Sequence, residues 1–103
     1  MWQARHGDVY LVKVEQLPKD AKPQEAVVPA QAILAYGEVT GHAHRVKDPT
    51  AKLWLDGTNT YLTVEQVAQL THEEHHTIVL EPGIYQVIHQ VEYAPTEYRR
   101  VVD

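Results

Sequence analysis

Short β-branched, apolar stretches alternate along the chain with clusters of turn-forming residues. Valine and tyrosine are frequent, and few good helix formers stand in runs. These features favour strands over helices. The strands expected from this pattern span residues 8–14, 42–47, 52–55, 60–64, 77–80 and 84–93.

Two of the expected connections have the sequence of a hairpin. Residues 56–59 read Asp-Gly-Thr-Asn, and Asp-Gly suits the positive-φ positions of a tight turn. Glu81-Pro82-Gly83 predicts a second hairpin, between residues 77–80 and 84–93. Pro29 lies inside the apolar stretch 26–39 and indicates an edge strand or an entry segment for the first part of that stretch.

Residues 63–76 are ambiguous between strand, helix and turn. Thr63-x-x-Gln66 matches a helix-capping box. As a strand, the segment instead places Leu62, Val64, Ala68 and Leu70 on one face. We expect a strand over residues 61–67 and a turn over residues 68–76.

Thr96 is placed to cap a short C-terminal helix over residues 96–102. The expected fold is therefore all-β, a single domain over residues 1–103, built as a small β-barrel or β-sandwich with a short C-terminal helix.

Composition narrows the classes of function. Nine Lys and Arg against 14 Asp and Glu give a formal net charge of −5, which argues against a nucleic-acid-binding protein. The chain contains no cysteine, so disulfides, thiolate metal sites and cysteine nucleophiles are excluded. No apolar run reaches the length of a membrane span, and residues 1–6 lack the apolar segment of a signal peptide. We expect a cytoplasmic protein, a homo-oligomer through its valine-rich edge strands, and a small molecule as ligand.

The seven histidines are the candidate chemistry. In an extended segment 42–47, His42 and His44 share one face with Val46, while Arg45 and Lys47 point to water on the other. Two inward imidazoles at this spacing can converge on one metal ion. The alternative is a pair of hydrogen-bonded histidines in a polar strand.

A second cluster contains His72, His75 and His76 and can supply further ligands, His72 and His75 before His76. It equally fits a polar surface turn. His89 lies in an apolar row, where a hydrogen-bonded core histidine is the more common outcome than a ligand. His6 has no partner nearby in the sequence and is expected to face solvent.

His72-Glu73-Glu74-His75-His76 also fits the zinc-protease pattern H-E-x-x-H. That mechanism needs both histidines on one face of a helix, with Glu73 as general base. The segment runs directly into an expected strand, and the pattern leaves His42 and His44 unused, so a minimal zinc protease is the less favoured alternative.

Gly37-x-x-x-x-His42-x-His44-x-x-x-Asp48 is similar to the first metal-binding motif of the cupin superfamily, and Glu81-Pro82-Gly83 resembles the turn of its second motif. This resemblance implies a small β-barrel that holds iron, manganese, zinc or nickel. It implies His42 and His44 as ligands and Asp48 in the place of the motif's glutamate. Residues 41–45 and 71–75 also look like parts of small uncharacterised bacterial and phage proteins.

The sequence thus predicts a divalent transition metal, Zn, Fe, Mn, Ni or Cu, held by His42, His44, His72 and His75, with His76 and His89 as weaker candidates. An open site would support a metal-dependent enzyme acting on a small molecule. Candidates for a general base are then Glu38, Glu73 and Glu74. A closed site would instead support a non-enzymatic, metal- or histidine-stabilised oligomeric binding module.

Overall fold

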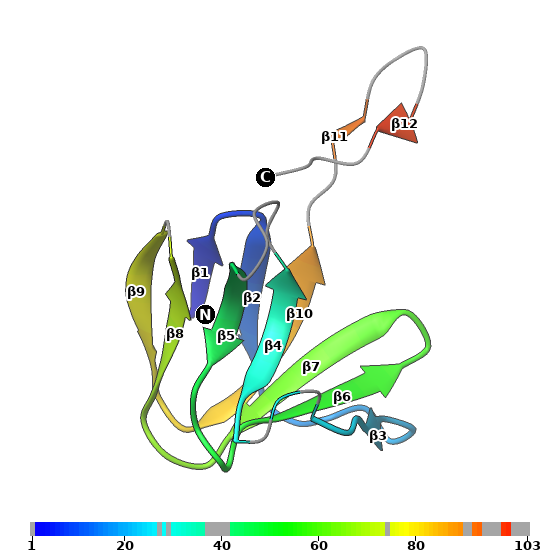
Figure 1. Cartoon of the computed structure of the whole chain (residues 1–103). Coiled ribbons are helices and arrows are strands. Elements are labelled where there is room, and N and C mark those ends of the chain that lie inside the picture. Colours follow the sequence, from blue (N-terminus) through cyan, green and yellow to red (C-terminus); the bar gives the residue numbers. More distant parts are fainter. Residues whose placement is uncertain are drawn as a thin grey trace.

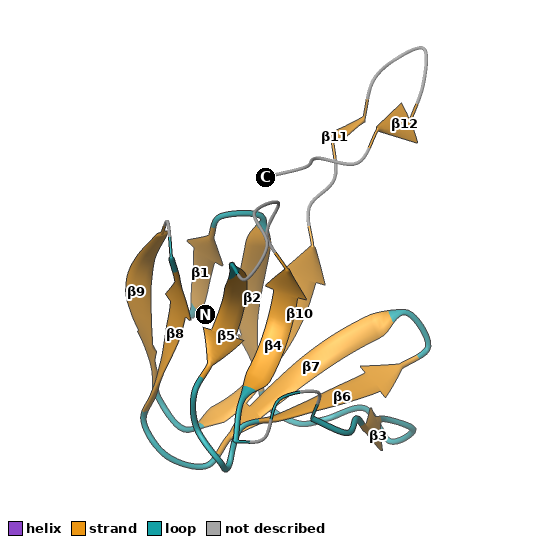
Figure 2. Cartoon of the chain, in the orientation of Figure 1, coloured by secondary structure: helices purple, strands orange, loops and turns teal. Residues whose placement is uncertain are grey.

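The computed structural model describes residues 2–26, 28, 30–36, 42–73, 75–89, 92–93 and 98–99. Within these ranges every regular element is a strand and all strand pairs are antiparallel (Figure 2). The described residues contain no helix long and apolar enough to cross a membrane. The expectation of an all-β fold is confirmed.

Two antiparallel sheets make up the body of the molecule (Figure 1). The six-stranded sheet contains, in spatial order, β1 (Gln3–His6), β2 (Val9–Val14), β10 (Gly83–His89), β7 (Asn59–Val64), β6 (Lys52–Asp56) and β3 (Lys22–Pro23). The four-stranded sheet contains β4 (Ala32–Tyr36), β5 (Ala43–Val46), β8 (Ala68–His72) and β9 (His75–Leu80). A separate pair is formed by β11 (Glu92–Tyr93) and β12 (Tyr98–Arg99).

The two sheets pack against each other through one apolar core. Both contribute to it, because alternate residues of each strand point to the same side. The buried core residues are Val9, Leu11, Ala32, Leu34, Val46, Leu62, Val64, Ala68, Leu70, Leu80, Tyr85 and Val87. The sheets keep separate edges, with β1 and β3 at the ends of one and β4 and β9 at the ends of the other. The arrangement is therefore a two-sheet packing and not a closed barrel.

The local alternation predicted much of this correctly. The strands over residues 8–14, 42–47, 52–55 and 60–64 are present. The hairpin at Gly57 is confirmed, and that glycine has a φ of +63°. The strand expected over residues 61–67 is present as far as Val64, where β7 ends, and its apolar residues Leu62 and Val64 are buried. The later part of the apolar stretch 26–39 forms β4 at a sheet edge, whereas residues 27 and 29 of its first part, for which an edge strand or entry segment was expected, lie outside the described residues.

The second hairpin prediction is wrong. β9 pairs with β8, whereas β10 inserts between β2 and β7 in the other sheet. The Glu81-Pro82-Gly83 segment therefore crosses between the sheets. The Tyr85 hydroxyl donates a hydrogen bond to the Glu81 carbonyl and so fixes this crossing. In the inserted position β10 has a hydrogen-bonded neighbour on both sides, which a hairpin with β9 would not provide.

The turn expected over residues 68–76 is instead most of a hairpin, formed by β8 and β9. The apolar side chains of Ala68 and Leu70 bury against the core, and this favours a strand. The expected C-terminal helix is not supported, because Tyr98–Arg99 pairs as a strand with Glu92–Tyr93. The other residues of that expected helix lie outside the described ranges. Of the strand expected over residues 84–93, residues 84–89 belong to β10 and residues 92–93 to β11, and residues 90–91 lie outside the described residues.

Candidate metal centre

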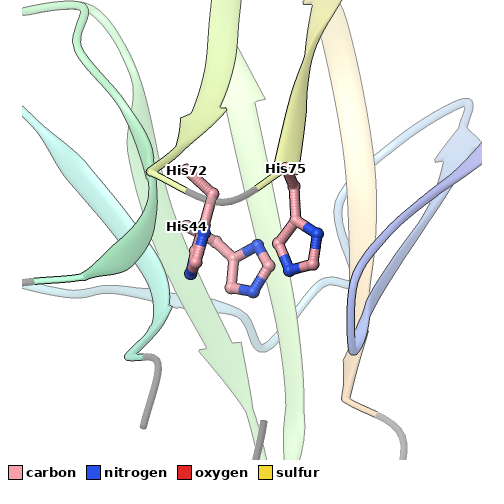
Figure 3. A group of neighbouring side chains, drawn as sticks. All are labelled: His44, His72 and His75. Atoms are coloured by element: carbon pink, nitrogen blue, oxygen red, sulfur yellow. The ribbon is translucent and has the colours of Figure 1, made fainter. Parts of the chain in front are cut away.

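Three histidines from three neighbouring strands converge at one end of the four-stranded sheet (Figure 3). One nitrogen of each imidazole of His44, His72 and His75 lies within 4.8 Å of the others. The ring centroids of His44 and His72 are 4.4 Å apart, and those of His72 and His75 are 4.5 Å apart. His44 is buried, whereas His72 and His75 are partly exposed. The cluster is thus anchored in the interior and reaches solvent on one side.

Strand register brings these three side chains together. Val46 lies opposite Leu70 and Arg45 lies opposite Thr71 in the β5–β8 pair. One further step along the same antiparallel ladder places His44 beside His72. Across the β8–β9 pair, His72 lies opposite His75. Directly opposed residues of antiparallel strands point to the same face, so the three imidazoles form a row across the sheet.

A register shift in the β8–β9 pair selects His75 over His76. Leu70 lies opposite Ile78, and a regular ladder from that pair would place His76 opposite His72. The shift between Leu70 and His72 brings His75 to that position instead. A β-bulge of this kind re-aims a side chain by moving it to the other face. The His76 side chain is correspondingly exposed.

His6 completes the cluster from the other sheet, and the expectation that it faces solvent is wrong. Its side chain is 0% exposed, at the end of β1. Its Nδ1 lies 2.8 Å from Nδ1 of His44, and its Nε2 lies 2.6 Å from the His76 carbonyl oxygen. The signal for this was Gly7-Asp8, which fits a hairpin turn. That hairpin places His6 opposite the core residue Val9.

The hydrogen bonds of His6 fix the proton positions. A carbonyl oxygen only accepts, so His6 Nε2 carries the proton and donates to His76. Burial lowers the pKa of His6; the His76 hydrogen bond raises it, and the neighbouring His75, His76 and His72 lower it further. With the proton of the neutral ring on Nε2, the lone pair is on Nδ1, which accepts the proton of His44 Nδ1. This tautomer leaves the lone pair of His44 on Nε2.

Gly7 allows the β1–β2 turn to approach the histidines closely. A Cβ atom at this position would lie 2.7 Å from Nε2 of His75 and 2.9 Å from Cε1 of His44. Its φ of +63° is also a conformation that residues with a Cβ rarely adopt. Both the turn and the space for the imidazoles therefore require glycine here.

A model of one protein family matches residues 5–90, a range that includes all of the histidines. The chain belongs to the DUF8820 family. That family is described as a domain of unknown function. Comparisons with curated proteins and with solved structures give no significant match.

In this DUF8820 chain the other predicted ligands lie at the margin of the cluster or outside it. The His42 ring is 5.9 Å from that of His72, and His42 is not among the three converging histidines. The exposed His89 lies within hydrogen-bonding distance of the Leu34 carbonyl, 2.7 Å from Nε2. The Asp48 carboxylate, implied by the cupin resemblance, accepts hydrogen bonds from Thr50 and Gln66.

The candidate general bases differ in what the structure shows of them. Glu38 and Glu74 lie outside the described residues. One oxygen of Glu73 accepts a hydrogen bond from the Ala43 amide at 3.1 Å, and the other lies 3.8 Å from the Arg45 guanidinium. Hydrogen bonds from its own backbone amide and from Ala43 lower the pKa of Glu73, and the nearby Arg45 guanidinium contributes. Glu73 therefore links the loop between β8 and β9 to strand β5.

The described residues that match the H-E-x-x-H pattern do not form a helix. The two histidines of the pattern are His72, which ends β8, and His76, the second residue of β9, so they lie on two strands of a hairpin. The zinc-protease arrangement places its two histidines one helical turn apart, with the glutamate on the same helix. The pattern match therefore carries no protease geometry in this chain.

Proposed function

We propose that this protein binds one divalent transition metal ion through His44, His72 and His75. The observation that carries the proposal is the approach of three imidazole nitrogens to within 4.8 Å of one another. Tetrahedral ligands with bonds of about 2.0–2.1 Å lie roughly 3.3 Å apart, so the side chains need to close by at most about 1.5 Å. We expect small movements of the partly exposed His72 and His75 rings to supply this adjustment.

The donor set defines the class of metal. Imidazole nitrogens without thiolates suit Zn, Fe, Mn, Ni and Cu, and the three ligands alone do not select among them. Three protein ligands leave the remaining coordination positions to water or to a small molecule on the exposed side of His72 and His75. The wider form of the proposal is a metal-dependent enzyme acting on a small molecule there.

The cupin resemblance is retained in part by this proposal. His44 keeps the ligand role that the resemblance implies. His72 and His75 replace His42 and Asp48 in the set, because strand register brings them next to His44. The corresponding test is ligand identity, in which the His42→Ala variant should retain metal binding.

Metal content and metal affinity test the proposal. Tag-free protein purified without added metal is analysed for Zn, Fe, Mn, Ni and Cu, and the chelated protein is then titrated with Zn²⁺. We expect one ion per chain, and weak or no binding in each of the variants His44→Ala, His72→Ala and His75→Ala. His89→Ala is the matched control, because that histidine is exposed and lies outside the cluster.

Thermal unfolding provides an independent measurement. A ligand at about 100 times its Kd stabilises the folded state by about 2.7 kcal/mol. For a domain of this size that corresponds to a rise in Tm on the order of 10–20 °C. Unchanged Tm with Zn²⁺, and equal metal stoichiometry in His44→Ala and the unmodified protein, would refute the site.

A non-enzymatic role makes a different prediction for the same protein. If the metal only stabilises the fold or an oligomer, the ion should be closed off from small anions. Adding azide to the Co²⁺-loaded protein should then leave the visible spectrum unchanged. A spectral change with azide supports a coordination position that a substrate can occupy.

A further inference from the structure

His6 is the one member of the histidine cluster that comes from the six-stranded sheet and lies outside the converging triad. Its ring centroid is 4.9 Å from that of His44 and 5.6 Å from that of His75. A fourth histidine at this distance raises the question of whether it is a fourth ligand. The answer decides whether the centre is closed by four imidazoles or left open by three.

Both ring nitrogens of His6 already have partners within the protein. Nε2 donates to the His76 carbonyl at 2.6 Å, and Nδ1 accepts from His44 Nδ1 at 2.8 Å. The ring is fully buried, so water cannot replace either partner. Turning Nδ1 toward a metal would leave the His44 Nδ1–H without its acceptor in the interior, which is unfavourable.

We propose that His6 is a positioning residue of the metal centre, which orients His44 through its Nδ1 and does not bind the ion itself. The inference rests on the proposed function. With Nδ1–H donated to His6, His44 presents Nε2 as its ligand atom. Metal-binding histidines commonly donate their second N–H to a protein acceptor, and that acceptor sets the tautomer and the orientation of the ring.

The second hydrogen bond extends this role to the strand that carries another ligand. The carbonyl that accepts from His6 belongs to His76, the residue that follows His75 in β9. His6 therefore connects β1 to β5 through a ligand side chain and to β9 through the backbone beside a ligand. These two bonds hold the positions of His44 and His75 before any ion arrives, and this preorganisation favours binding.

Cadmium NMR distinguishes a positioning residue from a ligand. Protein labelled with ¹⁵N at histidine is loaded with ¹¹³Cd²⁺, and scalar coupling between the two nuclei identifies each bound nitrogen. We expect coupling to Nε2 of His44 and to one nitrogen each of His72 and His75, and none to His6. Coupling to His6 would overturn this inference and leave the metal site standing. Absence of coupling to every histidine would refute the proposed function itself.

Substitutions at His6 test the positioning role. His6→Phe keeps the ring volume and removes both nitrogens, and we expect Zn²⁺ affinity to fall about 10–100-fold, as is typical for partners of metal-binding histidines. His6→Asn keeps an acceptor near the place of Nδ1 and should recover part of that loss. His89→Phe is the matched control and should bind as the unmodified protein does.

A purely structural role of His6 predicts a different result. It would lower the thermal stability of the metal-free protein without changing the ¹⁵N shifts that report the His44 tautomer. We expect His6→Phe to change those shifts and the visible spectrum of the Co²⁺-loaded protein. Unchanged shifts and spectrum in a folded His6→Phe variant would overturn the proposal, and the cadmium experiment decides the matter if that variant does not fold.

Discussion

Two buried polar groups lie at opposite ends of β5, and their surroundings differ in kind. His44 lies near the start of the strand and is 0% exposed. Asp48 lies just beyond its end and is 4% exposed. Burying either group is costly unless suitable partners are present. The groups that surround His44 and Asp48 therefore indicate the role of each residue.

Asp48 has hydrogen-bond donors as partners. Its carboxylate accepts hydrogen bonds from the amide and hydroxyl of Thr50 and from the side-chain amide of Gln66. Thr50 holds the turn between β5 and β6, and Gln66 lies in the connection from β7 to β8. The buried Asp48 carboxylate is therefore satisfied by hydrogen-bond donors from Thr50 and Gln66. Its role is to stabilise the two loops that carry these residues.

His44 is instead surrounded by groups of its own kind. His6, His72 and His75 are all within ring contact of it and come from three other strands. Such a set repels itself when protonated, and a cation that binds several lone pairs at once stabilises it. The comparison therefore separates a polar group that serves the fold from a cluster whose composition favours a ligand.

The largest expected effect comes from closing the space beside the histidines. Gly7→Ala places a methyl group 2.7 Å from His75 Nε2 and on a backbone with a φ of +63°. We expect the free energy of unfolding to fall by about 2–5 kcal/mol, from the unfavourable backbone conformation and from overpacking together. Zn²⁺ affinity should fall as well, because His75 has to move. Urea unfolding and a competition titration measure the two quantities.

Gly57→Ala is the matched control for that experiment. Its φ is also +63°, but a Cβ there meets nothing within 4 Å. Only the backbone cost of about 1–2 kcal/mol should appear, with unchanged metal affinity. If the two variants behave alike in both measurements, the close approach of the β1–β2 turn to the histidines has no functional meaning.

The sequence predicted what depends on local alternation. A strand with one apolar face needs no distant information, so β2, β5, β6 and β7 and the turn at Gly57 follow from neighbouring residues alone. The partner of each strand does not. Glu81-Pro82-Gly83 has the composition of a hairpin turn, yet its two strands enter different sheets, because β10 gains two neighbours between β2 and β7.

The same distinction between local pattern and strand pairing applies to the candidate site. His44, His72 and His75 were in the predicted set, because short-range spacing placed two clusters of imidazoles in the chain. The sequence analysis ranked His75 before His76, but the structural cause of that preference is the register shift in the β8–β9 pair, which the sequence pattern does not specify. Finding His6 depends on the packing of the β1–β2 hairpin across the other sheet.

The next prediction concerns Asp48, which lies just beyond the end of β5. Hydrogen bonds from the Thr50 side chain and amide, with that of Gln66, hold the pKa of Asp48 below its usual range, against the opposing effect of burial. Because its pKa is lower in the folded than in the unfolded protein, Asp48 stabilises the fold fully above the unfolded pKa. That contribution disappears as the pH falls through the folded pKa.

Asp48→Asn tests this assignment. We expect a loss of about 1–3 kcal/mol at neutral pH, from the weaker hydrogen bonds of a neutral acceptor, and a flatter dependence of stability on pH below about pH 4. Zn²⁺ affinity should stay unchanged. Urea unfolding at a series of pH values, with a metal titration at pH 7, makes both measurements. Loss of metal binding in this variant would place Asp48 in the metal centre, as the cupin resemblance implies.

The smallest expected effect is that of a substitution at Glu73. It tests whether Glu73 stabilises the fold, as Asp48 does, or takes part in the metal centre, as His44 does. It stands between two ligand positions in the sequence, but its carboxylate accepts from the Ala43 amide and faces Arg45. Glu73→Gln keeps an oxygen for Ala43 and removes the charge, so we expect a stability change below that of Asp48→Asn and little change in Zn²⁺ affinity. Glu65→Gln, also exposed, is the control for loss of one surface charge. A loss of Zn²⁺ binding as large as that of His44→Ala would make Glu73 a ligand and would replace the three-histidine centre with a mixed nitrogen and oxygen site.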